Sequence, residues 1–153
     1  MSVLADAAVL DQWTSALTAM TPGTLVTGID VSCCDRPRAA RSRLQQAMTR
    51  LAVSLYTGSA SRAVVVVWSG DHAAGDRIRS LAVATAESLH RHSEMTRGCP
   101  LGVSVVFADA ATPAEVLGAR LCHGRLVTDG VAAVGWEDVC AHGVAEAAAV
   151  SRL

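Results

Sequence analysis

The longest β-branched run of the chain is Val64 to Val67, and the polar loop Ser69 to His72 follows it almost at once. Four such residues in a row cannot alternate between a buried face and a solvent face, so both faces of this strand should be covered. Double coverage is typical of a parallel sheet between two layers of helices. The pattern therefore predicts a buried central strand whose carboxyl end carries a polar loop.

Helical periodicity is present on both sides of this strand. Apolar side chains recur at helical spacing over 37–56 and again over 78–92, and a weaker helical pattern opens the chain at 3–20. Further strands are predicted at 25–32 and 101–107. Strand–helix–strand units of this length indicate a mostly parallel α/β sheet flanked by helices, with right-handed crossovers.

The pattern changes in the last third of the chain. The pairs His123-Gly124 and Asp129-Gly130 separate short apolar segments, which is typical of tight turns between strands. We therefore expect a C-terminal antiparallel hairpin that extends the sheet. From Glu137 an alanine-rich tail predicts a closing helix.

Local signals predict two helix starts. Asp71 is well placed to cap the helix that reaches about His92. Thr112, Pro113 and Glu115 form the pattern of a capping box with proline at the first helical position.

Length and composition indicate a single α/β domain, 1–153. The 153 residues are 51% hydrophobic with a mean hydropathy of +0.34, enough for a substantial core. The formal net charge of −1 indicates neither nucleic acid nor an anionic membrane as a partner. All 13 basic residues are arginines, which excludes enzymes that depend on a lysine Schiff base or a P-loop lysine.

The five cysteines lack the paired spacing of a secreted disulfide scaffold, which favours reduced thiols and a cytoplasmic location. The first residues have no basic segment of the kind that opens a signal peptide. No uncharged run is long enough to span a membrane. The sequence therefore predicts a soluble cytoplasmic protein.

The order of elements over about 25–131 is strand, arginine-bearing helix, the segment Val-Val-Val-Val-Trp-Ser-Gly-Asp-His, helix, strand and hairpin. This order resembles a family of uncharacterised actinobacterial α/β proteins, whose members show a similar valine-rich strand followed by a short acidic loop. The opening helix departs from the family pattern. The resemblance implies a bacterial α/β protein with no assigned activity, so it assigns no catalytic residue and no cofactor to this chain.

Polar residues follow the first three predicted strands, and parallel strands would bring them to one edge of the sheet, where such folds bind ligands. The expected ligand-binding residues are Asp30, Ser32, Asp35, Ser69, Gly70, Asp71 and Asp109. A thiol at a helix start can ionise below its usual pH, so Cys33 or Cys34 is a candidate nucleophile with His72 as its base. Alternatively the aspartates cap helices and the cysteines are small buried hydrophobes.

Other chemistry has weaker support. Metal ligands could come from one of two sets, His90, His92 and Cys99 or Cys122, His123, Cys140 and His142. Neither set has the spacing of a recognisable zinc site, so no metal site is predicted and the cofactor stays unknown. The arginines of 36–50 fit either a grip on an acidic partner or the solvated face of a helix.

Three hypotheses about function remain open. The first is a small-ligand-binding or regulatory protein, whose partner is a small molecule or another protein and whose site lies at the carboxyl ends of the strands. The second is a hydrolase or transferase that uses a cysteine nucleophile with a histidine base. The third is a structural subunit that forms homo-oligomers through its alanine-rich terminal helices.

Overall fold

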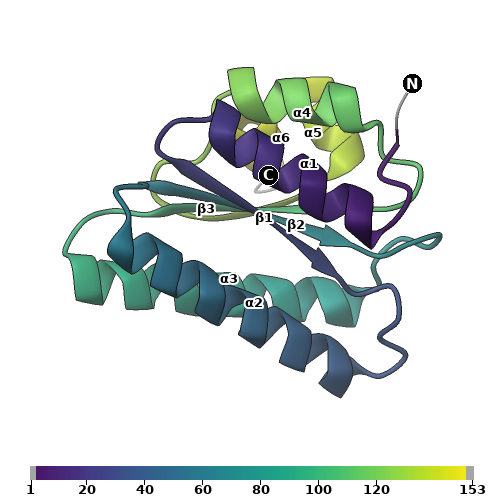
Figure 1. Ribbon diagram of the computed structural model, residues 1–153, viewed down its shortest axis with the longest axis horizontal. Coiled ribbons are helices and arrows are strands. Elements are labelled where there is room, and N and C mark those ends of the chain that lie inside the picture. Colours follow the sequence, from purple (N-terminus) through teal and green to yellow (C-terminus); the bar gives the residue numbers. More distant parts are fainter. Residues whose placement is uncertain (1–2, 151–153) are drawn as a thin grey trace.

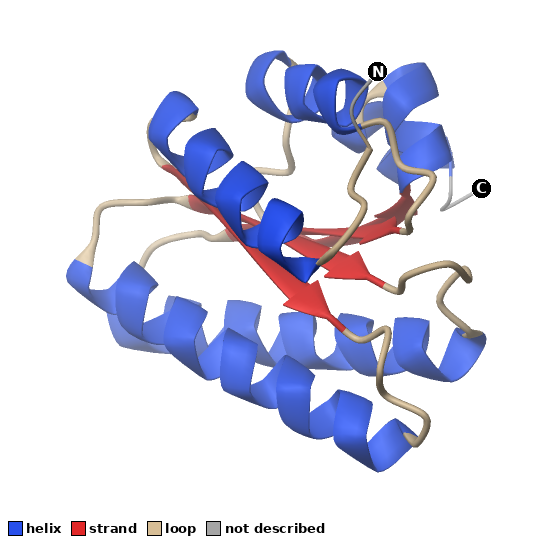
Figure 2. Ribbon diagram, turned by 45° about the vertical axis from the view of Figure 1, so that its right-hand side comes forward, coloured by secondary structure: helices blue, strands red, loops and turns tan. Residues whose placement is uncertain are grey.

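The fold is a four-stranded parallel sheet between two layers of helices, seen in a computed structural model that describes residues 3–150. The strands are adjacent in chain order: β1 (Thr24–Asp30), β2 (Arg62–Trp68), β3 (Gly102–Ala108) and β4 (Gly130–Gly135). One face is covered by α2 (Pro37–Thr57) and α3 (Asp76–Arg97) (Figure 1). The other is covered by α1 (Ala7–Met20), α4 (Ala114–His123), α5 (Trp136–His142) and α6 (Val144–Val150) (Figure 2).

The valine run lies at the centre of both hydrophobic layers, as the sequence predicts. Val64 and Val66 pack in the core beneath α1 and α4, whereas Val65 and Val67 pack in the core against α2 and α3. All four side chains are 0% exposed, and β2 has a parallel neighbour on each side. Strand β3 is buried along its whole length as well, so the two central strands share this role.

The crossovers place the helices on the two faces. The connections through α2 and α3 both pass beneath the sheet in Figure 1, and they are right-handed as expected. Strand order then continues in the same direction, but α4 lies on the opposite face. The connection from β3 to β4 therefore has the opposite hand, which is rare among parallel strands.

The prediction of a C-terminal antiparallel hairpin is wrong, because β4 pairs with β3 in parallel. The segment around Gly118 is helical instead of extended, and α4 continues to His123. Leu117 and Leu121 lie one helical turn apart and are both buried against the sheet. This helix carries the chain back across the sheet, so the following strand runs in the same direction as β3.

Both predicted caps are also wrong. Helix α3 begins at Asp76 after Gly75, five residues beyond Asp71. Helix α4 has Pro113 at its N-cap and no side-chain cap, because the Thr112 hydroxyl accepts a hydrogen bond from the backbone N–H of Asp109. The polar residues that suggested caps belong to the loops that precede the helices.

The predicted closing helix is divided into two short helices, α5 and α6, with Gly143 between them.

The first helix begins at Ala7, where the Asp6 carboxylate accepts a hydrogen bond of 2.9 Å from the backbone N–H of Val9. Among the helices of residues 3–150, none combines the length and the apolar character that crossing a membrane requires.

One leucine and one valine of α2 test which face of this helix packs against the sheet. Leu44 is 0% exposed, so Leu44→Ala should lower the free energy of unfolding by about 2–5 kcal/mol through lost apolar burial and a cavity. Val53 is 61% exposed, and Val53→Ala should change the free energy of unfolding by less than about 0.5 kcal/mol. Urea unfolding of both variants measures this, and equal losses would contradict the observed face of α2.

Candidate functional site

The residues of the predicted site do lie at one edge of the sheet. Asp30 and Trp68 end the paired strands β1 and β2, and Asp109 directly follows β3. The polar loops touch as well, since a β-carbon added to Gly70 would lie 2.9 Å from the β-carbon of Ser32. Gly70 also has a positive φ of 74°, so glycine suits this position for both reasons.

The polar atoms at this edge are used within their own loops. Asp30 accepts hydrogen bonds from the backbone N–H of Ser32 at 2.9 Å and from its hydroxyl at 2.6 Å. The Ser69 hydroxyl donates to the carbonyl oxygens of His72 and Ala108. Asp109 accepts from the backbone N–H of Ala111. Asp35, Asp71 and His72 are exposed.

Backbone hydrogen bonds also connect the loops that follow β2 and β3 at this edge. The N–H of Ser69 donates to the carbonyl of Ala108, and the N–H of Ala110 donates to the carbonyl of Gly70. The start of the chain is attached to the loop after β3, because Leu4 is fully buried and its N–H donates to the carbonyl of Thr112. Backbone pairing thus continues past the strand ends, where a ligand crevice was expected.

The candidate nucleophile Cys34 has a thiol that favours its protonated form. Burial raises the pKa of Cys34, and the neighbouring Cys33 raises it further, whereas Arg43 acts in the opposite direction. His72 is not among the groups that act on this thiol. A nucleophilic cysteine needs the thiolate, so the surroundings of Cys34 work against the thiol-enzyme hypothesis.

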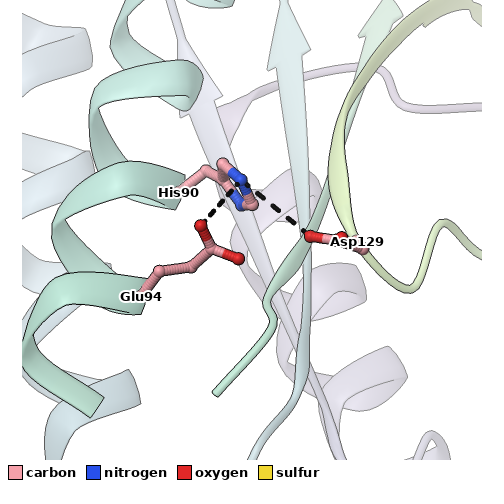
Figure 3. Close-up of side chains that lie close together, drawn as sticks. All are labelled: His90, Glu94 and Asp129. Atoms are coloured by element: carbon pink, nitrogen blue, oxygen red, sulfur yellow. Dashed lines mark ion pairs between the residues drawn. The ribbon is translucent and has the colours of Figure 1, made fainter. Parts of the chain in front are cut away.

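A different group of titratable side chains meets at the amino end of the strands. His90 and Glu94 lie one turn apart on α3, and Asp129 comes from the loop that enters β4 (Figure 3). The Nε2 atom of His90 lies 3.3 Å from Oε2 of Glu94 and 4.0 Å from Oδ1 of Asp129. Within residues 3–150 these are the contacts at ion-pair distance that the structure shows, and they are ion pairs only when the imidazole is protonated.

The strand register explains how Asp129 reaches α3. Gly102 pairs with Gly130, so the preceding residues Leu101 and Asp129 lie side by side at the edge. Gly102 is needed here, since a β-carbon on it would lie 1.8 Å from the carbonyl oxygen of Val127. The absence of a side chain lets the loop before β4 lie directly against β3.

The orientation of the His90 ring is fixed by the same edge. Nδ1 lies 2.8 Å from the carbonyl oxygen of Leu101. A carbonyl oxygen only accepts hydrogen bonds, so Nδ1 carries the proton, and in the neutral ring Nε2 presents a lone pair to the two carboxylates. Three acceptor atoms then face one another. A second proton on the ring or a cation between the three residues would relieve this repulsion.

Sequence reasoning found one member of this group and missed the other two. It paired His90 with His92 and Cys99, but His92 lines a groove between α2 and α3. Glu94 four residues after His90 was a readable signal, because i and i+4 residues share a helix face. Asp129 could not be found while it was read as part of a hairpin turn. In the described part of the chain, the set of Cys122, His123, Cys140 and His142 does not assemble into a metal-ligand group.

No protein-family model matches the chain, and neither a curated protein nor a solved structure is significantly similar to it. The resemblance to actinobacterial α/β proteins therefore remains a prediction.

Alkylation tests the thiol chemistry of the predicted site. Because its pKa is raised, the Cys34 thiol should react with iodoacetamide at pH 7 more slowly in the folded protein than in the urea-unfolded chain, and should accelerate as pH rises. Burial raises the pKa of Cys122 and Cys140 too, so both thiols should also react more slowly in the folded protein than in the unfolded chain. Fragment-level peptide mapping measures each thiol. Faster reaction of Cys34 in the folded protein would support the thiol-enzyme hypothesis.

Proposed function

We propose that the protein is a ligand-binding protein whose ligand is a divalent transition-metal ion of the zinc type, held by His90, Glu94 and Asp129. The observation that carries the proposal is the fixed ring of His90. Its Nδ1 is bound to the Leu101 carbonyl, and its Nε2 faces two carboxylates. Histidine ligands of metals are commonly held in this way through their second ring nitrogen.

The spacing of the ligand atoms supports the proposal. Metal bonds of about 2.1 Å in a tetrahedral site separate two ligand atoms by roughly 3.4 Å. The distance of 3.3 Å from Nε2 of His90 to Oε2 of Glu94 fits this value. The Asp129 oxygen lies 4.0 Å from Nε2 of His90 and has to approach that atom by about half an ångström. Asp129 is exposed, so its side chain is free to make that movement.

The charge of the group supports a divalent cation. With a neutral imidazole, Glu94 and Asp129 together give the group a charge of −2, and no arginine forms an ion pair with either carboxylate within residues 3–150. The mixture of one imidazole nitrogen and carboxylate oxygens suits zinc, manganese or iron better than a soft, thiolate-seeking ion. The burial of His90, whose side chain is 17% exposed, limits competition from solvent on one side.

Three protein ligands leave one position of a tetrahedral ion open. If the ion is bound, a water molecule or a donor atom of a small molecule would take that position. The bound ion would also join α3 to the loop before β4, the edge strand. Binding would therefore order this edge of the sheet, which suits a regulatory or sensing role.

The other two hypotheses remain alternatives. The thiol enzyme would depend on Cys33, which is exposed, because the surroundings of Cys34 disfavour its thiolate. Assembly through the terminal helices would require a surface on α5 or α6, where Val150 is an exposed apolar residue. Neither has an observation comparable to the fixed ring of His90.

Titration with Co²⁺ and Zn²⁺ tests the proposal on the intact chain. Co²⁺ should produce visible ligand-field absorption that Zn²⁺ removes. Loss of an outer-shell partner alone costs roughly 10–100-fold in metal affinity, so His90→Ala, which removes a ligand, should weaken binding by at least about 100-fold. Glu94→Gln and Asp129→Asn should each weaken it by about tenfold or more, because an amide is a poorer ligand than a carboxylate.

The matched control is His92→Ala, which removes an exposed imidazole two residues away on the same helix. It should leave the affinity unchanged. Absorption that is absent from the wild type, or that is lost equally in His92→Ala and His90→Ala, would contradict the proposal. His90 would then be an ion-pair partner that serves only to hold α3 against the edge strand.

A further inference from the structure

The outer surface of the α2–α3 layer contains a groove made of two adjoining cavities, which is separate from the His90 group. The larger has a volume of about 680 Å³ and the smaller of about 270 Å³. They share Thr49, Ala52 and His92, so they form one continuous depression between the helices. Volumes of this order are usual for sites that bind small molecules.

The smaller cavity is lined by two residues with unsatisfied polar atoms. Ser93 is only 3% exposed, and its hydroxyl has no hydrogen-bond partner. One terminal nitrogen of Arg97 donates to the carbonyl of Ala60 at 2.7 Å, but the other, Nη1, is buried and has no partner. Burying such groups without partners costs free energy, most of all for a charged group. A ligand that accepts hydrogen bonds would recover this cost.

The charge of the groove indicates which ligand it would take. Its lining contains the two arginines Arg41 and Arg97 and no aspartate or glutamate. Helix α2 has no acidic residue anywhere along Pro37–Thr57. Within residues 3–150, Arg97 has no carboxylate within ion-pair distance. The groove is therefore complementary to an anion.

Apolar side chains make up most of the remaining surface of the smaller cavity. Ala52, Val53 and Tyr56 line it from α2, and Met48 and Leu89 continue the apolar lining into the larger cavity. Val53 and Tyr56 are 61% and 71% exposed, which is high for large hydrophobic residues. An exposed apolar surface beside an unpaired guanidinium suits a ligand with one charged end and an apolar body.

We propose that this groove binds a small amphipathic monocarboxylate. Its carboxylate would accept hydrogen bonds from Arg97 and Ser93, and its apolar chain would lie along Ala52 toward Met48 and Leu89. A guanidinium binds a carboxylate with two parallel hydrogen bonds, and rotation of the Arg97 side chain would present its second nitrogen to the ligand. The site is independent of the proposed metal site, since no residue is shared between them.

Octanoate is a suitable probe, and 1-octanol is the matched compound without the charge. Calorimetry on the intact chain should show octanoate binding with at least about tenfold higher affinity than octanol, the difference expected for hydrogen bonds to a charged group. Ala52→Phe should abolish binding by filling the space that the two cavities share. Tyr56→Ala, at an exposed position that leaves the fold intact, should weaken it.

Ser93→Ala gives the sharpest comparison, because its effects on binding and on stability should differ. It should weaken octanoate binding without lowering the free energy of unfolding, since it removes a buried hydroxyl that has no partner. Ser80→Ala, at an exposed serine of α3 outside both cavities, should change neither quantity. Equal affinities for octanoate and octanol, unchanged binding in Ala52→Phe and Tyr56→Ala, or no binding to the wild type would each overturn the proposal.

Discussion

The rest of the structure depends on the burial of both faces of β2 and β3. Residues along each strand point alternately into two separate cores, with Val64 and Val66 in one and Val65 and Val67 in the other. Such strands are stable only when helices cover both faces of the sheet. Two long helices cover one face, whereas the other requires four shorter ones. The third crossover, through α4, is part of this second layer, and it explains why β4 runs parallel to its neighbour.

The position of the candidate metal site follows from that crossover. Helix α4 carries the chain back to the amino end of the strands, and the loop that follows it brings Asp129 beside Leu101. Helix α3 on the opposite face ends at the same edge, so its last turns supply His90 and Glu94. Gly102 completes the arrangement by leaving room for the loop. The site thus joins α3, which belongs to one helix layer, to the loop that leads from α4 in the other layer into β4.

Much of the fold could be predicted from the sequence because its strongest signals are local. The valine run, the helical stripe of α2 and the strand at β3 each contain their own pattern within one segment. The direction of β4 depends on whether the residues around Gly118 are helical, and short apolar segments beside glycines fit either state. The loops that precede α3 and α4 were misread because Asp71 and Thr112 resemble capping residues.

The candidate site was harder to predict because its members are brought together by topology. His90 and Glu94 share a helix face, but Asp129 is 35 positions away from Glu94 and reaches it only if β4 is parallel. The groove residues Ser93 and Arg97 belong to no sequence motif either. They stand out only because the Ser93 hydroxyl and Nη1 of Arg97 are buried without a hydrogen-bond partner, which the sequence does not show. The polar groups at the opposite edge were also hard to read from the sequence, for a related reason. Backbone groups beyond the strand ends paired with one another, which the composition of the loops does not reveal.

The metal ion proposed at the amino edge of the sheet can be sought directly in crystals. Anomalous diffraction from crystals grown with Zn²⁺, recorded on both sides of the zinc absorption edge, locates such an ion directly. We expect an anomalous peak within bonding distance, about 2.1 Å, of Nε2 of His90 and of one carboxylate oxygen each from Glu94 and Asp129. Anomalous peaks confined to other residues, with the His90 ring bound only to its two carboxylates, would contradict it.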